Sequence, residues 1–261
     1  MDGPSRFALR LAYLGTAFAG WQRQPGARTV QGTLEAAMAS LFGTPVRATA
    51  AGRTDAGVHA AGQVVHLDAP LPIPPAGLVA ALNARLPAEV RVLAARRVAP
   101  TFDARRHACG KHYCYRLAWE VVLPPWQAQR TWVLPSQPDL QRMAEALGQL
   151  VGSHDFAAFA RSGHAGTGQR GTVRSLVEAR LRWRGRRASV HLVGDGFLRG
   201  MARRIVGAVV EVGRGAQETA WLVALLADPT TRPPAPTAPA HGLTLERVYY
   251  RRPAPRGRGG R

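Results

Sequence analysis

The stretch RFALRLAYL, residues 6–14, alternates between apolar and other side chains. Every second residue from Phe7 to Tyr13 is apolar, and Arg10 lies on the opposite face, which predicts a half-buried strand. The elements predicted after it are a helix from Thr29 that ends at Gly43, a strand over 46–51, a loop over 52–59, a strand over 63–68, a helix over 74–86 and a strand over 90–98. The first part of the chain therefore has the order β-α-β-β-α-β.

The same order recurs in the second part of the chain. The elements predicted there are a strand over 112–122, a helix over 138–151, strands over 173–183 and 188–193, a helix over 197–212, a shorter helix over 217–227 and a strand over 243–250. Two successive units of this kind predict an α+β protein made of two ferredoxin-like halves. We expect their mainly antiparallel sheets to join and a central cleft to lie between them.

The chain divides into three predicted parts. Residues 1–103 form the first half, residues 104–252 the second, and residues 253–261 an arginine-rich tail. The tail has no apolar face to bury and is predicted to be disordered. Residues 228–239, DPTTRPPAPTAP, are a proline-rich connector within the second half that cannot be helical.

Positive charge dominates the composition of the chain. Its 261 residues carry 35 Lys+Arg against 16 Asp+Glu, a net charge of +19. A body this basic is typical of proteins that bind a polyanion, most often nucleic acid. Lys111 is the only lysine, so codon bias or a hot habitat could account for arginine in place of lysine. Neither accounts for the shortage of acidic residues.

The remaining composition excludes several other classes of protein. A chain that is 46% hydrophobic and 20% charged is an ordinary globular protein. No apolar run approaches the ~20 residues that span a bilayer, and the N-terminus lacks the apolar core of a signal peptide. Two cysteines rule out a disulfide framework. We expect a soluble protein of a reducing compartment, the cytoplasm.

The stretch GRTDAGVHA, residues 52–60, lies between two predicted strands. Gly52 and Gly57 permit backbone conformations that a side chain would block. They present Asp55 at a loop tip, with Arg53 two residues before it and His59 four residues after it. A carboxylate in a basic site is a candidate nucleophile, general base or metal ligand. A hairpin turn with a surface aspartate is the alternative.

This stretch resembles the signature of the tRNA pseudouridine synthase A (TruA) family, and further family-like blocks follow in the same order. These blocks are 18–22 (FAGWQ), 62–66 (GQVVH), 102–105 (FDAR), 111–115 (KHYCY), Asp155-Phe156 with Phe159, and Phe197-Leu198 through Met201, Arg203, Ile205, Val206 and Gly207. The resemblance covers nearly the whole chain and leaves out only the C-terminal tail.

The resemblance implies a tRNA pseudouridine synthase, an isomerase that converts uridine to pseudouridine at positions 38, 39 and 40 of the anticodon arm. The reaction breaks an N-glycosidic bond, rotates the uracil and forms a C–C bond. It therefore calls for no cofactor and no metal. The resemblance also implies that tRNA is the partner, that the target base is flipped out of its stack, and that the enzyme is a homodimer.

Asp55 occupies the position of the family's nucleophile. Its carboxylate would attack the ribose or the uracil ring, or abstract a ribose proton. Because desolvation tends to neutralise an aspartate unless a cation lies nearby, we assign that role to Arg203, which matches the family's helix arginine. The alternative for Arg203 is a surface arginine on a basic helix, since Arg199 and Arg204 lie close to it in sequence.

Tyr113 and Arg53 are the predicted substrate-binding residues. Tyr113 matches the family's active-site tyrosine, whose ring stacks on the target base, although locally it also fits a core strand position. Tyr115, two residues later, fits plain packing better. Arg53 matches an arginine that takes the place of the extruded base, because a guanidinium plane can stack in the gap. A phosphate contact is the alternative for Arg53.

Two competing functions follow from other features of the sequence. His59, His66 and Asp68 with Asp55 could suggest a metal-dependent nuclease, but the two histidines lack compact ligand spacing. A non-catalytic RNA-binding protein would carry aromatic RNP-type motifs on its central strands, and the sequence has none. Phe18 and Trp21 are interpreted as loop packing.

The chain departs from the family pattern at three positions. Leu14 stands where the family usually has aspartate, Asp195 where it usually has asparagine, and Gly171 where a hydroxyl residue is common. These differences concern loop packing and RNA contacts. None of them falls on a predicted catalytic residue.

Overall fold

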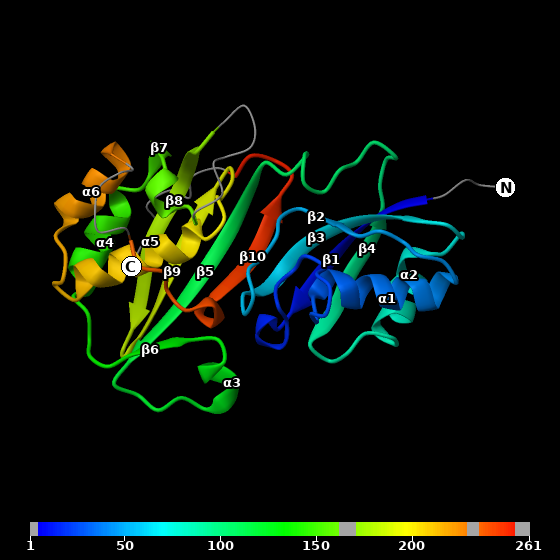
Figure 1. The fold of residues 1–261 in the computed structure, drawn as a ribbon, viewed down its shortest axis with the longest axis horizontal. Helices are drawn as coiled ribbons and strands as arrows, with labels where there is room; N and C mark the ends of the chain where they lie inside the picture. Colours follow the sequence, from blue (N-terminus) through cyan, green and yellow to red (C-terminus); the bar gives the residue numbers. More distant parts are fainter. Residues whose placement is uncertain (1–4, 162–170, 229–234, 254–261) are drawn as a thin grey trace. The chain divides into compact units, whose positions relative to one another are not determined.

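The computed structural model describes residues 5–161, 171–228 and 235–253. These residues divide into two compact units (Figure 1). The first extends to Ala108 and includes Thr244–Tyr250; the second extends from Cys109 to Leu243 and includes 251–253. Of the tail predicted over 253–261, residues 254–261 lie outside the described residues, and so do residues 229–234 of the predicted connector.

Apart from the short η1 and the last strand, β10, the first unit has the order of elements that the sequence predicts. Its elements are β1 (Ser5–Tyr13), the 3-10 helix η1 (Gly15–Ala17), α1 (Val30–Phe42), β2 (Thr49–Ala50), β3 (His59–Ala69), α2 (Pro75–Asn83), β4 (Val90–Arg97) and β10 (Leu243–Tyr249). The strands lie in the order β4-β1-β3-β10, and β2 pairs with β3. β1 is antiparallel to both of its neighbours, as expected for a mainly antiparallel sheet.

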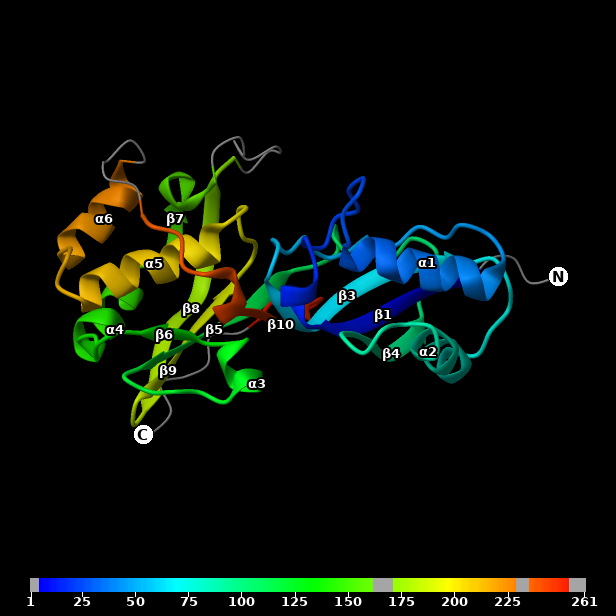
Figure 2. The same ribbon diagram turned by 60° about the horizontal axis from the view of Figure 1, so that its bottom comes forward.

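Local chemistry explains where these elements begin and end. Phe7, Leu9 and Leu11 on β1 are fully buried, which confirms that the alternating apolar residues of this strand face the core. Thr29 caps α1 by accepting a hydrogen bond from the backbone of Gly32, and Gly43 ends the helix in the left-handed region at φ +70°. α1 and α2 contact each other beside the strands (Figure 2).

The last strand returns to the first unit. β10 pairs in parallel with β3, with Thr244 opposite His59, whereas the sequence analysis groups it with the second half. Gly62 makes this approach possible, because a Cβ atom there would lie 2.3 Å from the carbonyl oxygen of Glu246. Because the paired residues lie far apart in the sequence, no local sequence pattern predicts this pairing.

The second unit contains the other predicted strands and helices and five further short elements. Its elements are β5 (Gly110–Trp119), α3 (Pro125–Ala128), β6 (Trp132–Leu134), α4 (Leu140–Gly148), β7 (Gly152–Asp155), the 3-10 helix η2 (Ala157–Phe159), β8 (Val173–Arg184), β9 (Arg187–Gly194), α5 (Met201–Gly213), α6 (Thr219–Ala227) and the 3-10 helix η3 (Ala240–Gly242). The strands lie in the order β5-β9-β8-β7, all antiparallel, and β6 adds to β5 in parallel. The elements α3, β6, β7, η2 and η3 are only three or four residues long, too short to show a periodic pattern in the sequence, and were not predicted.

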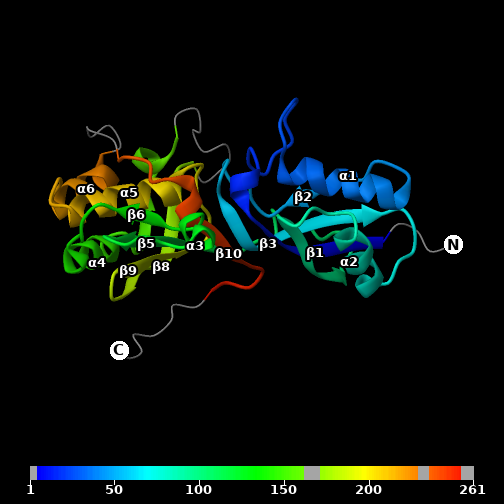
Figure 3. The same ribbon diagram turned by 90° about the horizontal axis from the view of Figure 1, so that it is seen from below.

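The sheet of the second unit has two unlike faces. One face is apolar and buried, with Tyr115, Val190 and Leu192 each at most 1% exposed. The other face is polar, because the pleat places Arg116, Ser189 and their neighbours on the opposite side. α4, α5 and α6 pack against one another, and α4 contacts β8 (Figure 3). The prediction of an α+β fold with mainly antiparallel sheets is confirmed.

A chain of polar groups crosses this second face. A ring nitrogen of His112 lies 3.0 Å from one of His191, whose other nitrogen lies 3.1 Å from the hydroxyl of Ser189. Burial, reinforced by His112 and by nearby arginines, lowers the pKa of His191 to about 4. His191 is therefore neutral at physiological pH. No helix in the described part of the chain is long and apolar enough to span a membrane.

Replacement of His191 by Gln should make stability less sensitive to acid. The ordinary pKa of histidine is 6.5 and the folded value is about 4, so between these values the unfolded chain binds a proton that the folded chain does not. Stability from this residue is thus present above pH 6.5 and declines as the pH falls toward 4. On acidification across that window we expect the Tm of the wild type to fall about 2–4 °C further than that of His191→Gln, a modest figure because the ring is partly exposed. Parallel curves of Tm against pH would contradict this assignment.

Candidate active site

The loop between β2 and β3 presents Asp55 as part of a tight turn. The backbone N–H of Val58 donates to the carbonyl of Asp55 at 3.1 Å. Gly57 adopts φ +80° within the turn, a conformation that favours glycine. Asp55 is half-buried, and the neighbouring Arg53 is exposed. Asp55 therefore lies at the tip of a defined turn, on the same loop as an exposed arginine.

A buried hydrogen-bond network fixes this loop from below. The hydroxyl of Tyr13 lies 2.9 Å from that of Thr54, and the amide of Gln63 donates to the carbonyl of Gly52 at 2.7 Å. The same amide also lies 3.4 Å from the hydroxyl of Tyr13. Burial raises the pKa of Tyr13 to about 12, so its hydroxyl stays protonated. Because these groups are buried and satisfied, the network holds the residue that precedes Asp55 in one position.

Residues 15–21 hold the loop from its other side. Trp21 donates its backbone N–H to the carbonyl of Thr54 at 3.0 Å, and Gly57 donates to the carbonyl of Phe18 at 3.4 Å. Both aromatic side chains are buried, at 2% and 5% exposure, which agrees with their interpretation as loop packing. A Cβ atom at Gly15 would lie 2.0 Å from the carbonyl oxygen of Val58, so this contact requires glycine.

The two histidines of the suggested metal cluster accept hydrogen bonds from the backbone. His59 accepts from the N–H of Gly15 at 3.1 Å, and His66 accepts from that of Ala104 at 3.0 Å. Burial lowers the pKa of His66, which keeps that ring neutral and able to accept. Both side chains thus hold together segments distant in sequence.

Asp68, the further member of that cluster, pairs with Arg6. The guanidinium of Arg6 donates to both carboxylate oxygens at 2.7 Å, and this pairing lowers the pKa of Asp68. Among the residues that the structure describes, no three His, Cys, Asp or Glu side chains gather in an arrangement that could hold a metal ion.

Tyr113 lies on β5 in the second unit, in a mostly buried position. The residue is 7% exposed, and its ring meets that of Phe197 edge-on at 4.9 Å. Phe197 belongs to one of the family-like blocks, so two of those blocks meet here. Tyr115 lies on the same face and donates its hydroxyl to the carbonyl of Pro239 at 2.8 Å. The plain packing expected for Tyr115 agrees with its 1% exposure.

Arg203 lies in the first turn of α5 and is partly buried. Its Nε donates to the carbonyl of Ala238 at 2.8 Å, and the N–H of Ala238 donates back to the carbonyl of Arg203 at 3.1 Å. The segment around Ala238 packs directly on α5, because a Cβ atom at Gly207 would lie 2.1 Å from the carbonyl oxygen of Pro236. Arg203 is therefore oriented by a specific backbone partner and differs from an ordinary surface arginine.

The neighbouring Arg204 has a different role. Its guanidinium donates to the carbonyls of Ala158 and Ala160 at 3.2 and 2.8 Å, and burial lowers its pKa. This bond ties α5 to the η2 segment. The two adjacent arginines of α5 thus serve separate purposes.

At Asp195 and Leu14, where the chain departs from the family pattern, the local contacts do not depend on the residue that the family usually has. A carboxylate oxygen of Asp195 accepts from the backbone N–H of Ser175 at 3.0 Å, a bond that the amide oxygen of asparagine would also make. Leu14 is partly exposed at 37%, and the close contact of this segment is made by the glycine that follows it. Gly171 adopts φ +51°, a conformation that favours glycine.

The predicted residues are divided between the two units. Asp55 and Arg53 share one loop of the first unit, whereas Tyr113 and Arg203 belong to the second. The supporting roles of Tyr13, Thr54 and Gln63 are not predicted from the sequence. The last two lie within the family-like blocks, which is the signal that could have pointed to them.

Comparisons with known proteins agree on one family. A family model described as tRNA pseudouridine synthase matches residues 11–105 and 146–251, which include Asp55 and Arg203 but not Tyr113. The tRNA pseudouridine synthase A of Solidesulfovibrio magneticus is 45% identical over 97% of this chain and 94% of its own length. The corresponding protein of Frankia casuarinae is 43% identical over 95% and 90%. The tRNA pseudouridine synthase A 1 of Desulfotalea psychrophila is 40% identical over 93% and 98%.

Similarity to solved structures is weaker. A crystal structure of a Cbf5-Nop10-Gar1 complex contains a chain that matches with a TM-score of 0.33 and 13% identity, over 78% of this chain and 45% of that one. A similarity this low adds nothing to the assignment. The family model and the relatives together establish that this chain belongs to the tRNA pseudouridine synthase family.

Proposed function

We propose that this protein isomerises uridine to pseudouridine at positions 38, 39 and 40 of the tRNA anticodon arm, with Asp55 as the nucleophile. The observation that carries the proposal is a half-buried aspartate on a loop fixed from two sides, by Tyr13 and Gln63 and by residues 15–21. A reacting group held by packed neighbours is positioned in advance for its substrate.

The reaction needs no net oxidation or reduction. The bond from N1 of uracil to C1′ of ribose breaks, the base rotates, and a bond from C5 to C1′ forms. C5 loses one proton and N1 gains one, so all atoms are conserved. Asp55 would act by attack on C1′, by attack on the uracil ring, or by abstraction of a ribose proton, and all three routes use its carboxylate in ionised form.

Three further residues complete the proposed machinery. Tyr113 would stack on the uracil, and Arg203 would compensate the negative charge of Asp55. Arg53 would fill the space that the flipped base leaves in the RNA stack. The exposure of Arg53 and the fixed Nε of Arg203 support these roles. A cytoplasmic location is also proposed, since Cys109 and Cys114 are both thiols.

Replacement of Asp55 by Asn should abolish pseudouridine formation while tRNA binding stays largely intact. Asparagine keeps the size of the side chain but cannot act as a nucleophile, and loss of a nucleophile reduces kcat by about 10⁴-fold or more. The measurement is single-turnover pseudouridine formation on an unmodified tRNA transcript, with a binding assay and a melting curve as controls for folding. A variant that works at near the wild-type rate would refute the assignment.

Replacement of Arg203 by Met should lower kcat more than it changes KM, because a charge partner of the nucleophile acts mainly on the chemical step. Arg203→Lys restores the positive charge but not the hydrogen bond from Nε to Ala238. We expect kcat of Arg203→Lys to be about tenfold higher than kcat of Arg203→Met, because a factor of ten corresponds to roughly 1.4 kcal/mol of charge stabilisation. If Lys and Met are equally impaired, the charge role is wrong and the hydrogen bond is what matters.

The homodimer that the resemblance implies is also part of the proposal. Two copies would double the basic surface available to one tRNA. Light scattering in solution should give a mass twice the 28.0 kDa of the chain at micromolar concentration. A mass of a single chain under the same conditions would contradict it.

A further inference from the structure

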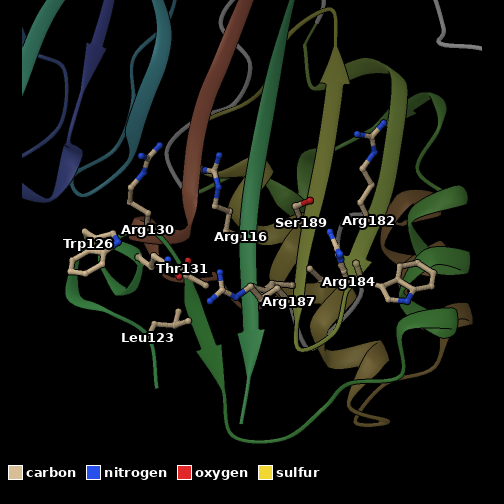
Figure 4. A pocket seen from close by; sticks show the side chains of 13 residues that line it. Arg116, Leu123, Trp126, Arg130, Thr131, Arg182, Arg184, Arg187 and Ser189 are labelled. Atoms are coloured by element: carbon tan, nitrogen blue, oxygen red, sulfur yellow. The ribbon is translucent and has the colours of Figure 1, made fainter. Parts of the chain in front are cut away.

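The polar face of the second unit's sheet carries an open depression. Its volume is about 550 Å³. Strand β5, the segment over α3 and β6, and the hairpin of β8 and β9 surround it (Figure 4). The residues used in the argument below are Arg116, Trp126, Arg130, Arg182, Arg184 and Arg187.

Arginine is the main charged residue of this depression. Arg182, Arg184 and Arg187 are exposed, and within the part of the chain that the structure describes they have no ion-pair partner. No Asp or Glu side chain of the described residues lines the depression, and Glu178 and Glu120 are paired with Arg180 and Arg186. The depression therefore has a strong excess of positive charge.

Arg130 provides a second, independent sign of a missing partner. Its Nε is buried and has no hydrogen-bond acceptor among the described residues. A buried donor without an acceptor is unfavourable, and the oxygen of an anion would satisfy it. Figure 4 shows the guanidinium groups of Arg116 and Arg130 extending in the same direction from neighbouring segments. A guanidinium, with its planar fork of N–H donors, fits a phosphate better than the ammonium of a lysine would.

The groups behind the arginines do not offset their charge. His191 is held neutral by burial and by surrounding positive groups that include Arg116 and Arg182. Its hydrogen-bonded neighbours, His112 and Ser189, contribute no negative charge. The polar face therefore presents an uncompensated positive field to any ligand that approaches it.

An aromatic side chain stands beside this charge. Trp126 is 70% exposed and lines the depression. Trp183 also borders it, but the pleat directs its side chain to the other face of the sheet from Arg182 and Ser189. Exposed indole rings next to arginines are typical of surfaces that bind RNA, in which bases stack on the rings while phosphates contact the cations. A metal-binding or small apolar site would not combine these residue types.

We propose that this depression binds the sugar-phosphate backbone of RNA, with an unpaired base or ribose against Trp126, and so forms a second contact with the substrate in addition to the Asp55 loop. That the RNA is tRNA rests on the proposed function. Arg182 and Arg187 contact phosphates from outside, and Arg130 completes the site from within. This surface sets affinity and leaves the chemical step unchanged.

The test compares two variants, one that lacks two positive charges at the depression and one that lacks two positive charges elsewhere on the chain. The variant is Arg182→Gln/Arg187→Gln, and the matched control is Arg47→Gln/Arg85→Gln, in which two exposed arginines of the first unit lose the same charge. Binding of an unmodified tRNA transcript is measured over a series of salt concentrations. The association constant K falls as salt rises, so the slope of log K against log salt is negative. Loss of two phosphate contacts should make this slope shallower by about 2 relative to the control and should raise Kd about tenfold or more.

Trp126 is tested in the same assay by two substitutions. Trp126→Ala should weaken binding about tenfold, and Trp126→Phe should retain most of the affinity because it keeps a stacking surface. Equal losses in both variants would remove the stacking contact from the proposal.

The outcomes separate this inference from the proposed function and from a rival occupant. The Arg182→Gln/Arg187→Gln variant should form pseudouridine at the wild-type single-turnover rate when enzyme saturates tRNA, and its mass by light scattering should be unchanged. If the slope of log K against log salt for this variant equals that of the control, the proposed RNA site is wrong. A lowered mass also overturns it, because the face is then a contact between copies of this chain. Failure of the proposed function would instead appear as wild-type protein that forms no pseudouridine.

Discussion

The hydrogen bond between the hydroxyls of Tyr13 and Thr54 is the interaction on which the candidate site depends. It is buried, it links the first strand to the loop that carries Asp55, and Gln63 extends it to Gly52. A polar network in an apolar interior is favourable only when each member is satisfied, so it specifies one arrangement of the loop. The position of Asp55 is thus set by the core of the first unit.

Glycine makes the complementary contribution on the other side of this loop. At Gly15 and Gly20 the backbone of residues 15–21 comes so close to the loop that a Cβ atom would meet carbonyl oxygens at 2.0 and 2.9 Å. This closeness lets Trp21 donate its backbone N–H to the loop. Two segments that lie outside the strands and α-helices thereby support each other, which explains why the chemistry sits on a loop without losing precision.

The sequence predicts the order of strands and helices well where hydrophobic periodicity is strong, as in β1 and α1. For α1 it also predicts both ends of the helix, at Thr29 and Gly43. It does not predict the parallel return of β10 to β3, because the close approach at Gly62 leaves no local pattern. The motif points to Asp55 as the reacting group. The network around Tyr13 escapes prediction because that residue reads as one more apolar position of an alternating strand.

The distribution of arginine decides how its abundance should be interpreted. A uniform bias in composition would spread exposed arginines evenly and leave each beside solvent. In the described residues some are built into the fold instead, such as Arg6 with Asp68 and Arg204 with two backbone carbonyls. Others, such as Arg182 and Arg187, gather without carboxylates on one face of a sheet. Like charges repel, so such a gathering is costly unless an anion compensates it. A polyanionic partner accounts for both the excess of arginine and its location, whereas bias accounts only for the choice of arginine over lysine.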